Sequence, residues 1–417
     1  MLKVIELFAG VGGFRLGLEK TKFFNIVLGN QWEPSKKAQD AFNCYASNFK
    51  TGVHLNQDIA TIDIENIPEA DVLVGGFPCQ DYSVARSLSG EQGIQGKKGV
   101  LFWEIMRLVN QLNKKPKFIL LENVDRLLKS PSTQRGRDFG IMLSSLSNAG
   151  YDVEWRIINA AEYGMAQRRR RVFIFAYRSN SEYANSLKDK SSDEILFNEG
   201  LFAKKFPVEP WLNNLSKITE EEITSDILST SDNFKAQFYN GGIMRNGKFL
   251  TQELTPKIEK PTPLKEILER NVDEKYYLKE EVAKKFEYLK GPKRIERTSA
   301  TGHKYIFSEG GMSFPEDLDK PGRTMLTSEG TSNRSSHVIA DLDTNRLRFL
   351  TPVECERLNG FPDNWTNTGM SERMRYFCMG NALVVDLVAR MGERIKEIEL
   401  EFNKELVVTK KEENVSL

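Results

Sequence analysis

The chain is poor in the residues that build metal sites and disulfide frameworks. Its 417 residues include only four cysteines and three histidines, and no two cysteines form a CxxC pair. Structural zinc sites and disulfide-stapled folds need clustered ligands at characteristic spacings, so we expect neither of them and no bound metal. Any chemistry that a cysteine performs here would have to come from its own thiol.

Long apolar runs and a large net charge are absent as well. No apolar stretch approaches the roughly 20 residues that span a bilayer. Residues 1–6 enter an expected strand directly, without the charged and apolar regions of a signal peptide. We therefore expect a cytoplasmic protein without a membrane partner. The net charge is +1, so any surface that binds nucleic acid must be local.

What the sequence does contain is an alternation of apolar strands and amphipathic helices. Strands are expected at residues 3–8, 25–28, 72–74, 117–121, 153–158 and 172–177, with helices near 15–19, 101–112 and 138–149 between them. This alternation predicts an α/β fold with a Rossmann-like, doubly wound, mostly parallel sheet. The polar and irregular sequence after residue 178 predicts a smaller, loop-rich, β-leaning unit, and a last helix is expected near 382–402.

A glycine-rich turn follows the first strand. Residues 9–14, Ala-Gly-Val-Gly-Gly-Phe, open into an expected helix, and a strand, a glycine turn and a helix together let a nucleotide-like ligand approach the backbone. The alternative is an ordinary tight turn between a strand and a helix. Because the turn departs from the GxGxxG pattern, a nicotinamide cofactor is not favoured.

Polar side chains stand where the next strands end. Gln31 and Trp32 follow the second strand; a polar group there can bond ribose hydroxyls, and the indole can cover an adenine or a cation. Asp58, further along, can accept a bond from an adenine amino group. The alternatives are core packing for Trp32 and helix capping for Asp58.

The strand at 72–74 ends in a turn that presents a thiol. Gly75, Gly76 and Pro78 bend the chain just before Cys79, and polar residues follow at once. One alternative is that Cys79 only fills space, since free cysteine is among the most buried residue types. A space-filling cysteine would not need such a turn, so we favour a nucleophile at the mouth of the sheet.

Further segments point to the same edge of the sheet. The strand at 117–121 ends in Glu122, and residues 167–171, Gln-Arg-Arg-Arg-Arg, adjoin the last strand. Such a run is usually a solvated basic face. Alternation, however, sends Arg169 and Arg171 to one side, where two guanidinium groups beside a nucleophile indicate phosphate or carbonyl recognition. Residues 81–99 are rich in glycine and are predicted to form a lid-type loop.

Taken together, these segments resemble the DNA (cytosine-5)-methyltransferase family of restriction-modification systems. The resemblance covers residues 3–177 and 348–394. Its motifs occur in the family's usual order: the cofactor motif at 8–14, Gly-Phe-Pro-Cys-Gln at 76–80, Glu-Asn-Val at 122–124, the QxRxR element at 167–171, the motif at 348–351 with 357–362, and Gly-Asn at 380–381.

The resemblance implies S-adenosylmethionine as cofactor and a flipped cytosine in double-stranded DNA as substrate. It makes residues 1–178 the catalytic and cofactor-binding domain and residues 179–345 the variable region and target-recognition domain. Residues 346–417 become a C-terminal segment whose last helix packs back on the catalytic domain. It also implies a monomer that reads a short DNA sequence, with a cognate restriction endonuclease as functional partner.

The implied reaction assigns a role to each of four residues. Cys79 adds to ring carbon 6, Glu122 donates a proton at ring nitrogen 3, Arg171 binds the ring carbonyl oxygen, and Arg169 positions a phosphate or the loop. The residues expected around the cofactor are Phe8, Gly10, Gly12, Gly13, Phe14, Gln31, Trp32, Asp58, Ile59, Phe77, Pro78, Leu101, Asn381 and Ala382.

The expected DNA contacts fall in two places. Gln80 and Ser83 are expected near the flipped base. A base-reading segment at 290–338 is expected to act through Arg323, Thr324, Arg334 and Ser335, because its turns and short extended run suit a major groove. The alternatives are that these arginines touch only phosphates, or that recognition lies between residues 233 and 271.

Some positions depart from the family pattern, and other functions remain open. Gln31, Ala166 and Ala382 occupy positions where the family often has glutamate, proline and serine, respectively. None of these differences affects Cys79, Glu122 or Arg171. The rival readings are an RNA cytosine methyltransferase of the same family, an inactive DNA-binding member, and a Rossmann-like dehydrogenase that uses Cys79.

Overall fold

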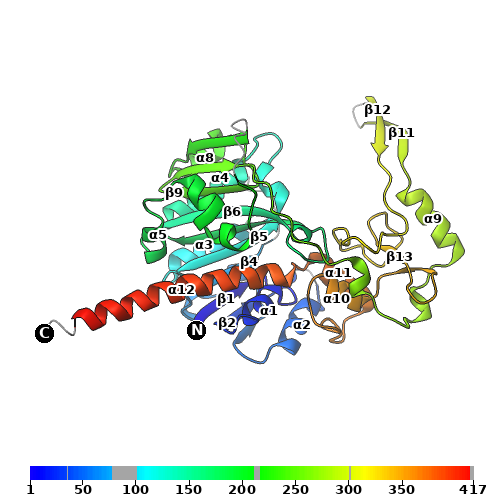
Figure 1. Cartoon of the computed structure of the whole chain (residues 1–417), viewed down its shortest axis with the longest axis horizontal. Coiled ribbons are helices and arrows are strands. Elements are labelled where there is room, and N and C mark those ends of the chain that lie inside the picture. Colours follow the sequence, from blue (N-terminus) through cyan, green and yellow to red (C-terminus); the bar gives the residue numbers. More distant parts are fainter. Residues whose placement is uncertain (35, 78–100, 211–216, 300–301, 414–417) are drawn as a thin grey trace.

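A large mixed sheet with helices on both faces forms one lobe, and shorter elements form a second lobe beside it (Figure 1). The computed structural model describes residues 1–34, 36–77, 101–210, 217–299 and 302–413, with side chains up to residue 402. Cys79 and its neighbours Pro78, Gln80 and Ser83 therefore lie outside the described residues.

The described strands of the sheet follow the order β3-β2-β1-β4-β5-β7-β6-β9-β10-β8. Their bounds are β1 (Leu2–Leu7), β2 (Phe24–Asn30), β3 (Val53–Leu55), β4 (Val72–Gly76), β5 (Phe118–Val124), β6 (Tyr151–Asn159), β7 (Arg170–Arg178), β8 (Ile218–Glu222), β9 (Gly241–Arg245) and β10 (Lys248–Gln252). Parallel pairing joins β3, β2, β1, β4 and β5, and antiparallel pairing joins the others. Since β6 and β10 point the same way as the first five, most strands share one direction.

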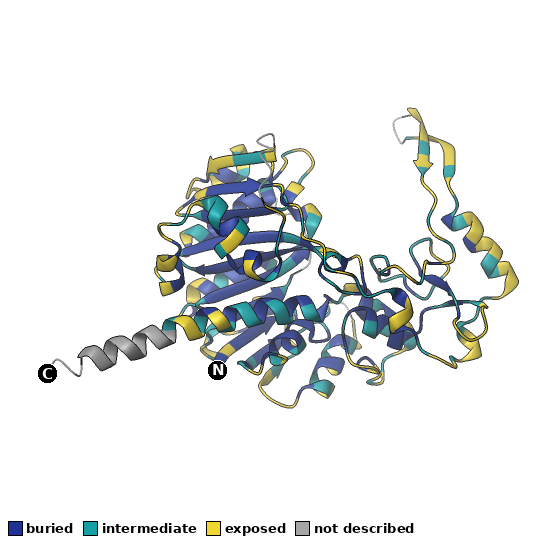
Figure 2. Ribbon diagram, in the orientation of Figure 1, coloured by how far each residue is buried: buried dark blue, intermediate teal, exposed yellow. Residues whose placement is uncertain are grey.

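Both faces of the sheet are covered, which explains the continuous apolar runs of its strands. Leu73 of β4 packs in one core with α3 (Leu101–Gln111) and α4 (Arg137–Asn148). Its neighbours Val72 and Val74 pack on the other face with α1 (Gly13–Glu19) and α12 (Val385–Glu413). Apart from the edge strands β3 and β8, the strands are accordingly buried along most of their length (Figure 2).

The strand order predicts a ligand crevice at the carboxyl ends of β1 and β4. The chain turns from β1 to β2 on one side, whereas β4 pairs with β1 on the other. Such a reversal leaves the two strand ends uncovered by a connecting helix, which is where open α/β sheets bind ligands. The glycine-rich turn follows β1, and the segment that leads to Cys79 follows β4.

The predicted α/β class is confirmed, but the sheet does not end at residue 178. Strands β8, β9 and β10 extend it from a segment that we expected to lie in the variable region. Residues 324–326, expected to be extended, form no strand. The last helix does lie on the main lobe: a Cβ added at Gly17 of α1 would come within 2.7 Å of the Val388 Cβ of α12.

The second lobe shares a hydrophobic core with the glycine-rich turn and α2 (Asp40–Asn48) of the main lobe, and it projects a two-stranded ribbon (Figure 1). Its elements are η8 (Leu264–Ile267), α9 (Glu280–Lys290), β11 (Lys293–Thr298), β12 (Lys304–Glu309), β13 (Val338–Ala340), β14 (Leu347–Phe349), α10 (Pro352–Leu358) and α11 (Glu372–Asn381). α10 starts as its sequence predicts, with Thr351 as N-cap and a capping box to Glu354. In the described part of the chain, no helix meets the length and apolarity that a membrane crossing requires.

Candidate active site

The glycine-rich turn forms an open cradle after β1. Phe8, Gly10 and Gly12 have φ values of 54°, 55° and 91°, in the left-handed region that favours glycine. A Cβ at Gly10 would meet no atom within 4 Å, whereas one at Gly12 would come within 2.3 Å of the Phe49 ring. The Gly10 N–H donates to Gln31 Oε1 at 2.8 Å, so the turn is fixed to the end of β2 while its backbone faces open space.

A buried carboxyl group that we did not predict lies in β1 just before this turn. Glu6, near the end of β1, is 0% exposed. It accepts hydrogen bonds from the Tyr45 hydroxyl at 3.0 Å and from the Arg15 N–H at 3.3 Å. Burial raises the pKa of Glu6 to about 8. Its sequence signal was an acidic residue inside an otherwise apolar strand.

The expected adenosine contacts lie beside the cradle. Trp32 is 38% exposed, so it does not pack in the core, and its ring remains open to a ligand. Asp58 caps a short 3₁₀ turn by accepting from the Ala60 N–H at 3.0 Å. Capping leaves one of its carboxylate oxygens for another partner, while Ile59 is buried beneath it. Both positions therefore fit a nucleoside beyond the end of β2.

The end of β4 is tied to the end of β5. Phe77 is buried, and its carbonyl accepts a hydrogen bond from Asn123 Nδ2 at 2.9 Å. Phe77 also packs near Phe102 of α3, with ring centroids 6.0 Å apart, and half-buried Leu101 begins that helix. The family-motif residue Asn123 thus fixes the point where the chain leaves the sheet toward Cys79.

Glu122 and Arg171 meet at this edge of the sheet, on the neighbouring strands β5 and β7. Arg171 Nε lies 2.9 Å from Glu122 Oε1, and the two side chains are 17% and 13% exposed. Burial raises the pKa of Glu122, although the guanidinium groups of Arg171 and Arg169 act in the opposite sense. Glu122 also lies over β4, because a Cβ at Gly76 would be 3.2 Å from its Oε2. The pair therefore faces the strand that leads to Cys79.

Arg169 is an interior residue and not a surface cation. It is 1% exposed and donates to the carbonyls of Met325 and Gly380, both at 3.1 Å. Burial lowers its pKa to about 9. Of its two expected roles, these contacts favour positioning a loop over binding a phosphate.

That loop, residues 322–337, is called the strap here. Gln167 holds it as well, because its Oε1 accepts from the Met325 N–H at 3.0 Å and its Nε2 donates to Asn359 Oδ1 at 2.8 Å. Asn359 in turn donates to the Met379 carbonyl at 2.8 Å. The QxRxR element, the motif at 357–362 and the end of α11 therefore form one joint between the lobes.

The Gly-Asn motif returns the chain to the glycine-rich turn. Asn381 ends α11 and is exposed, and Ala382 caps that helix through a bond from its N–H to the Cys378 carbonyl at 2.9 Å. A Cβ at Gly13 would lie 3.0 Å from Leu383 Cδ1, so the two motifs are in contact. Phe14 turns inward to the core and is 3% exposed, so it supports the site from behind.

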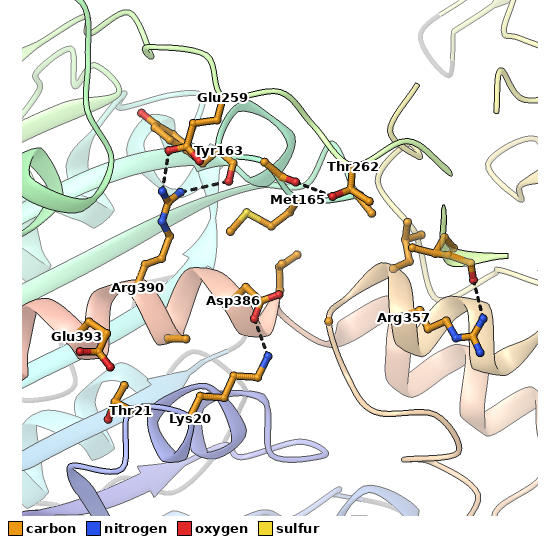
Figure 3. A pocket seen from close by; sticks show the side chains of 17 residues that line it. Lys20, Thr21, Tyr163, Met165, Glu259, Thr262, Arg357, Asp386, Arg390 and Glu393 are labelled. Atoms are coloured by element: carbon orange, nitrogen blue, oxygen red, sulfur yellow. Dashed lines mark hydrogen bonds and ion pairs between the residues drawn. The ribbon is translucent and has the colours of Figure 1, made fainter. Parts of the chain in front are cut away.

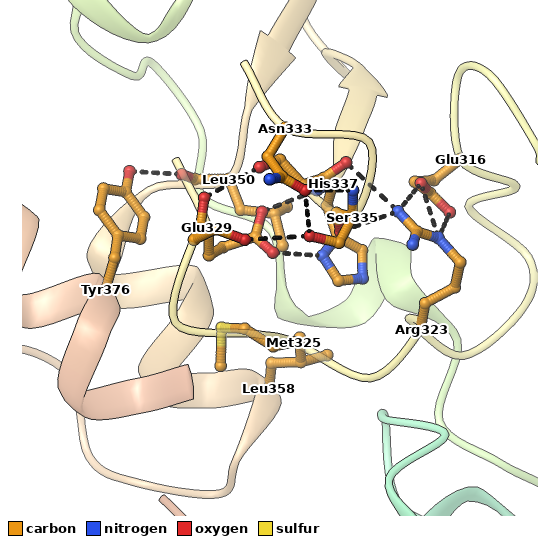
Figure 4. A network of polar contacts seen from close by, with 12 residues as sticks. Glu316, Arg323, Met325, Glu329, Asn333, Ser335, His337, Leu350, Leu358 and Tyr376 are labelled. Carbon is orange, nitrogen blue, oxygen red and sulfur yellow. Dashed lines mark hydrogen bonds and ion pairs between the residues drawn. The ribbon is translucent and has the colours of Figure 1, made fainter. Parts of the chain in front are cut away.

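The expected base-reading residues all form hydrogen bonds within the strap and its surroundings, as Figure 4 shows for Arg323 and Ser335, and base reading by them stays a prediction. Arg323 pairs with buried Glu316 through Nε and Nη2, at 3.1 and 2.7 Å. Arg334 donates to three backbone carbonyls, Thr324 donates to the Arg168 carbonyl at 2.6 Å, and Ser335 bonds Asn333 at 2.7 Å. The partners of these donors are a buried carboxylate and backbone carbonyls, which the local sequence does not reveal.

None of the described cysteines can supply a thiolate near neutral pH. Cys44, Cys355 and Cys378 are all buried, and burial raises the pKa of Cys44 and of Cys378 to about 12. Over the described ranges, no group of three or more His, Cys, Asp or Glu side chains is arranged to hold a metal ion.

A cavity of about 610 Å³ lies away from this edge, between α1, α12 and the connection at 163–166 (Figure 3). Its charged groups are already paired: Lys20 with Asp386 at 2.6 Å, and Arg390 with Glu259 at 2.7 Å. None of the predicted site residues lines it. We therefore place the active site at the carboxyl edge and treat this cavity as a gap in the joint between the lobes.

Comparison with known proteins decides the family. The model of the C-5 cytosine-specific DNA methylases matches residues 2–397. The chain belongs to this family. It is 58% identical to the type II methyltransferase M.Sau3AI of Staphylococcus aureus, over 95% of this chain and 96% of that protein. It is 28% identical to the type II methyltransferase M.Bsp6I of Bacillus sp. (strain RFL6), over 95% and 98%.

Solved structures agree on the fold. The structure of the S. pombe Dnmt2 methyltransferase aligns over 95% of this chain and 99% of its own, with a TM-score of 0.58 and 15% identity. A Spodoptera frugiperda DNMT2 mutant aligns over 94% and 99%, with a TM-score of 0.59. The protein is thus a DNA cytosine-5 methyltransferase, as the motifs predicted, and membership implies DNA as substrate and S-adenosylmethionine as methyl donor.

Proposed function

We propose that this methyltransferase modifies a cytosine that is extruded from duplex DNA, through covalent addition of Cys79 to ring carbon 6. The observation that carries the proposal is the pair of Glu122 and Arg171, 2.9 Å apart, over the end of the strand that leads to Cys79. A proton donor and a cation at that edge suit a ring that gains negative charge when a thiolate adds to it.

Each residue answers a specific demand of the reaction. Cytosine carbon 5 is a poor nucleophile until the Cys79 thiolate bonds to carbon 6 and pushes an electron pair into the ring. Glu122 protonates ring nitrogen 3, and Arg171 binds the neighbouring carbonyl oxygen. After methyl transfer, loss of the carbon-5 proton restores the double bond and expels Cys79.

The environment of Glu122 supports its role as an acid. Burial raises its pKa, so the carboxyl group retains a proton to higher pH than an exposed glutamate would. The nearby Arg171 works against this but supplies a second donor for the ring. The two residues together provide two hydrogen bonds to one edge of the base, which also distinguishes cytosine from the other pyrimidine.

The cradle after β1 fits S-adenosylmethionine, which supplies an electrophilic methyl group when bound. The open backbone at Gly10 leaves room for a ligand against the turn. Trp32 offers an exposed aromatic face for an adenine ring or for the sulfonium cation, while Asp58 and Gln31 offer oxygen acceptors. Gln31 already accepts from Gly10, so one of its lone pairs remains for a ribose hydroxyl.

Duplex DNA requires that the target base leave the helix, since ring carbons 5 and 6 lie inside the stack. Extrusion costs a few kcal/mol of stacking and pairing, and we place Gln80 and Ser83 beside the extruded base. We also propose a cognate restriction endonuclease as functional partner, and the likeness to type II methyltransferases supports this. We further propose that the enzyme acts as a monomer in the cytoplasm.

The rival substrate is RNA. A tritiated-cofactor assay on duplex DNA, on RNA and on neither tests the proposal, with Cys79→Ser as the matched variant. We expect label in 5-methylcytosine of duplex DNA only, and none with Cys79→Ser because a hydroxyl is a far weaker nucleophile. Preferential labelling of RNA, or a serine variant within tenfold of wild type, would overturn it.

A further inference from the structure

We propose that the ribbon of β11 and β12 enters the major groove of the target DNA and reads base edges with one of its two faces. The inference rests on the proposed function, because it concerns how the same enzyme selects its duplex site. It replaces the strap residues, which are engaged within the protein, by a different set of side chains.

Exposure sets the ribbon apart from the strap. Arg294, Ile295, Glu296, Arg297 and Thr298 are all exposed, and Figure 1 shows the ribbon standing clear of both lobes. On β12, Tyr305 is 42% and Ile306 is 55% exposed. Side chains of this kind add nothing to the core, and an isolated two-stranded ribbon is marginally stable in water. Both facts indicate an element that is completed by a partner.

The strand register sorts the ribbon into two faces. Arg294 pairs with Ser308, Glu296 with Ile306 and Thr298 with Lys304, so these side chains share one face, the polar face. The opposite face carries Ile295, Phe307, Arg297 and Tyr305. There the Arg297 guanidinium stacks over the Phe307 ring at 3.8 Å from its centroid. Arg297 is thereby engaged, whereas Arg294 has no hydrogen-bond or ion-pair partner in the described chain.

The polar face has the chemistry of a base reader. Arginine bonds guanine through two acceptors, and threonine contacts the thymine methyl group. The carboxylate of this face, Glu296, is paired with Lys304 at 3.4 Å. A two-stranded ribbon also fits the width of a major groove. The strands carry four basic and two acidic residues, an excess that suits entry between two phosphate backbones.

Hydrogen bonds at the base of the ribbon fix its orientation relative to the second lobe. Arg334 of the strap donates to the carbonyls of Leu289 and Gly291, which precede β11, and to that of Gly310, which follows β12. Just below, Lys290 is fully buried and pairs with Glu316 at 2.8 Å. The Arg334 guanidinium thus bonds the backbone at both ends of the ribbon. It joins the ribbon to the strap, which Arg169 and Gln167 bind on the other side.

The test compares two exposed arginines on the same strand. Unmethylated genomic DNA is treated with wild type, Arg294→Ala or Arg297→Ala, and all methylated cytosines are mapped by sequencing. We expect Arg294→Ala to lose about 5- to 150-fold in kcat/KM at the wild-type site and to accept other bases at one position. Arg297→Ala, on the opposite face, should keep the wild-type choice of bases.

A chemical change in the DNA sharpens the test. Replacing guanines of the mapped site by 7-deazaguanine removes the N7 acceptor from the major groove. It should weaken wild type at one guanine and leave Arg294→Ala unaffected there. Two results would show that the ribbon does not read bases. In the first, wild type modifies a defined site and Arg294→Ala modifies the same site with the same choice of bases. In the second, Arg294→Ala binds all DNA sequences equally more weakly and with a lower salt dependence. If wild type modifies no DNA, the proposed function itself fails.

Discussion

At the scale of single residues, the candidate site contains carboxyl groups whose pKa is raised by burial. Glu6 lies in β1 and Glu122 in β5, each near the carboxyl end of its strand, and burial raises the pKa of each. They differ in their neighbours: Glu122 faces two guanidinium groups, whereas Glu6 bonds a hydroxyl and a backbone N–H. Glu122 is therefore suited to give up a proton, and Glu6 to hold one.

We predict that Glu122→Gln lowers the single-turnover rate of methyl transfer by about 10²- to 10⁴-fold, the usual contribution of a general acid. Wild type should slow as pH rises through the pKa of Glu122, because the carboxyl group then loses its proton. The variant should lose this alkaline decline. Asp125→Asn is the control, since Asp125 is a nearby carboxylate, 40% exposed, that pairs with Arg170.

Rates of Glu122→Gln and wild type that agree within tenfold across the pH range would remove Glu122 from the mechanism. Cofactor affinity, measured by calorimetry, should be alike in both proteins, because Glu122 lies on β5 and not in the cradle after β1.

Glu6 gives a prediction about stability. Its pKa is about 8 in the folded protein against an ordinary value of 4.5, so between these pH values the folded chain holds a proton that the unfolded chain releases. The free energy of unfolding should therefore fall as pH rises from about 4.5 to 8, by at most about 1.4 kcal/mol per pH unit from this group. In Glu6→Gln the decline should be shallower.

Urea unfolding at pH 5.5, 6.5 and 7.5 measures that slope, with Glu65→Gln, at an exposed position, as the control. Equal slopes in wild type and Glu6→Gln would show that Glu6 is ionised in the folded protein.

At the scale of elements, the strap is the piece that joins the two lobes. It passes so close to the end of α11 that a Cβ at Gly380 would lie 2.5 Å from the backbone of Leu326 and of Thr327. The same glycine offers its carbonyl to Arg169. The glycine of the Gly-Asn motif is thus explained by packing between backbones.

We predict that Gly380→Ala lowers the free energy of unfolding by about 1–3 kcal/mol, the usual cost of overpacking a core position. Gly310→Ala is the matched control, because a Cβ there would meet nothing within 4 Å. Urea unfolding of both variants checks this. An equal free energy of unfolding in the two variants would show that the strap moves aside for the added methyl group without loss of stability.

The elements also show how far sequence reasoning reaches. Strands β1, β2, β4, β5, β6 and β7 were predictable, because apolar runs, glycines and polar strand ends are local signals. Strands β3, β8, β9 and β10 were not: β3 has only three residues, and β8 is short and polar and pairs only at the edge of the sheet. At β9, Gly242 is required because a Cβ would overlap the Trp155 ring, a long-range demand without a local pattern.

The same distinction holds for the site. Glu122 and Arg171 were predictable from strand ends and alternation. The internal roles of Arg323 and Arg334 were not, because they depend on Glu316 and on carbonyls far along the chain. An arginine-rich turn has the same sequence whether it faces DNA or its own backbone.

At the scale of the whole molecule, two lobes meet over one edge of the sheet. The main lobe supplies the cradle, Glu122, Arg171 and the segment that leads to Cys79, and the second lobe supplies the strap and the ribbon. Duplex DNA between the lobes would meet the ribbon on one side and the catalytic edge on the other. The joint built from Gln167, Arg169 and Asn359 fixes the relation between them.

The central claim is that Cys79 forms a covalent bond with cytosine in duplex DNA, and a trapped adduct tests it most directly. Duplexes made with 5-fluorocytosine retain fluorine at carbon 5, so the step that expels the thiolate is blocked. With S-adenosylmethionine present, wild type should form a complex with the DNA that survives denaturing electrophoresis, and peptide mass spectrometry should place the bond at Cys79. Cys79→Ser should form none. A wild-type enzyme that methylates ordinary duplex DNA without trapping on the fluorinated duplex, or an adduct that persists in Cys79→Ser, would contradict the account.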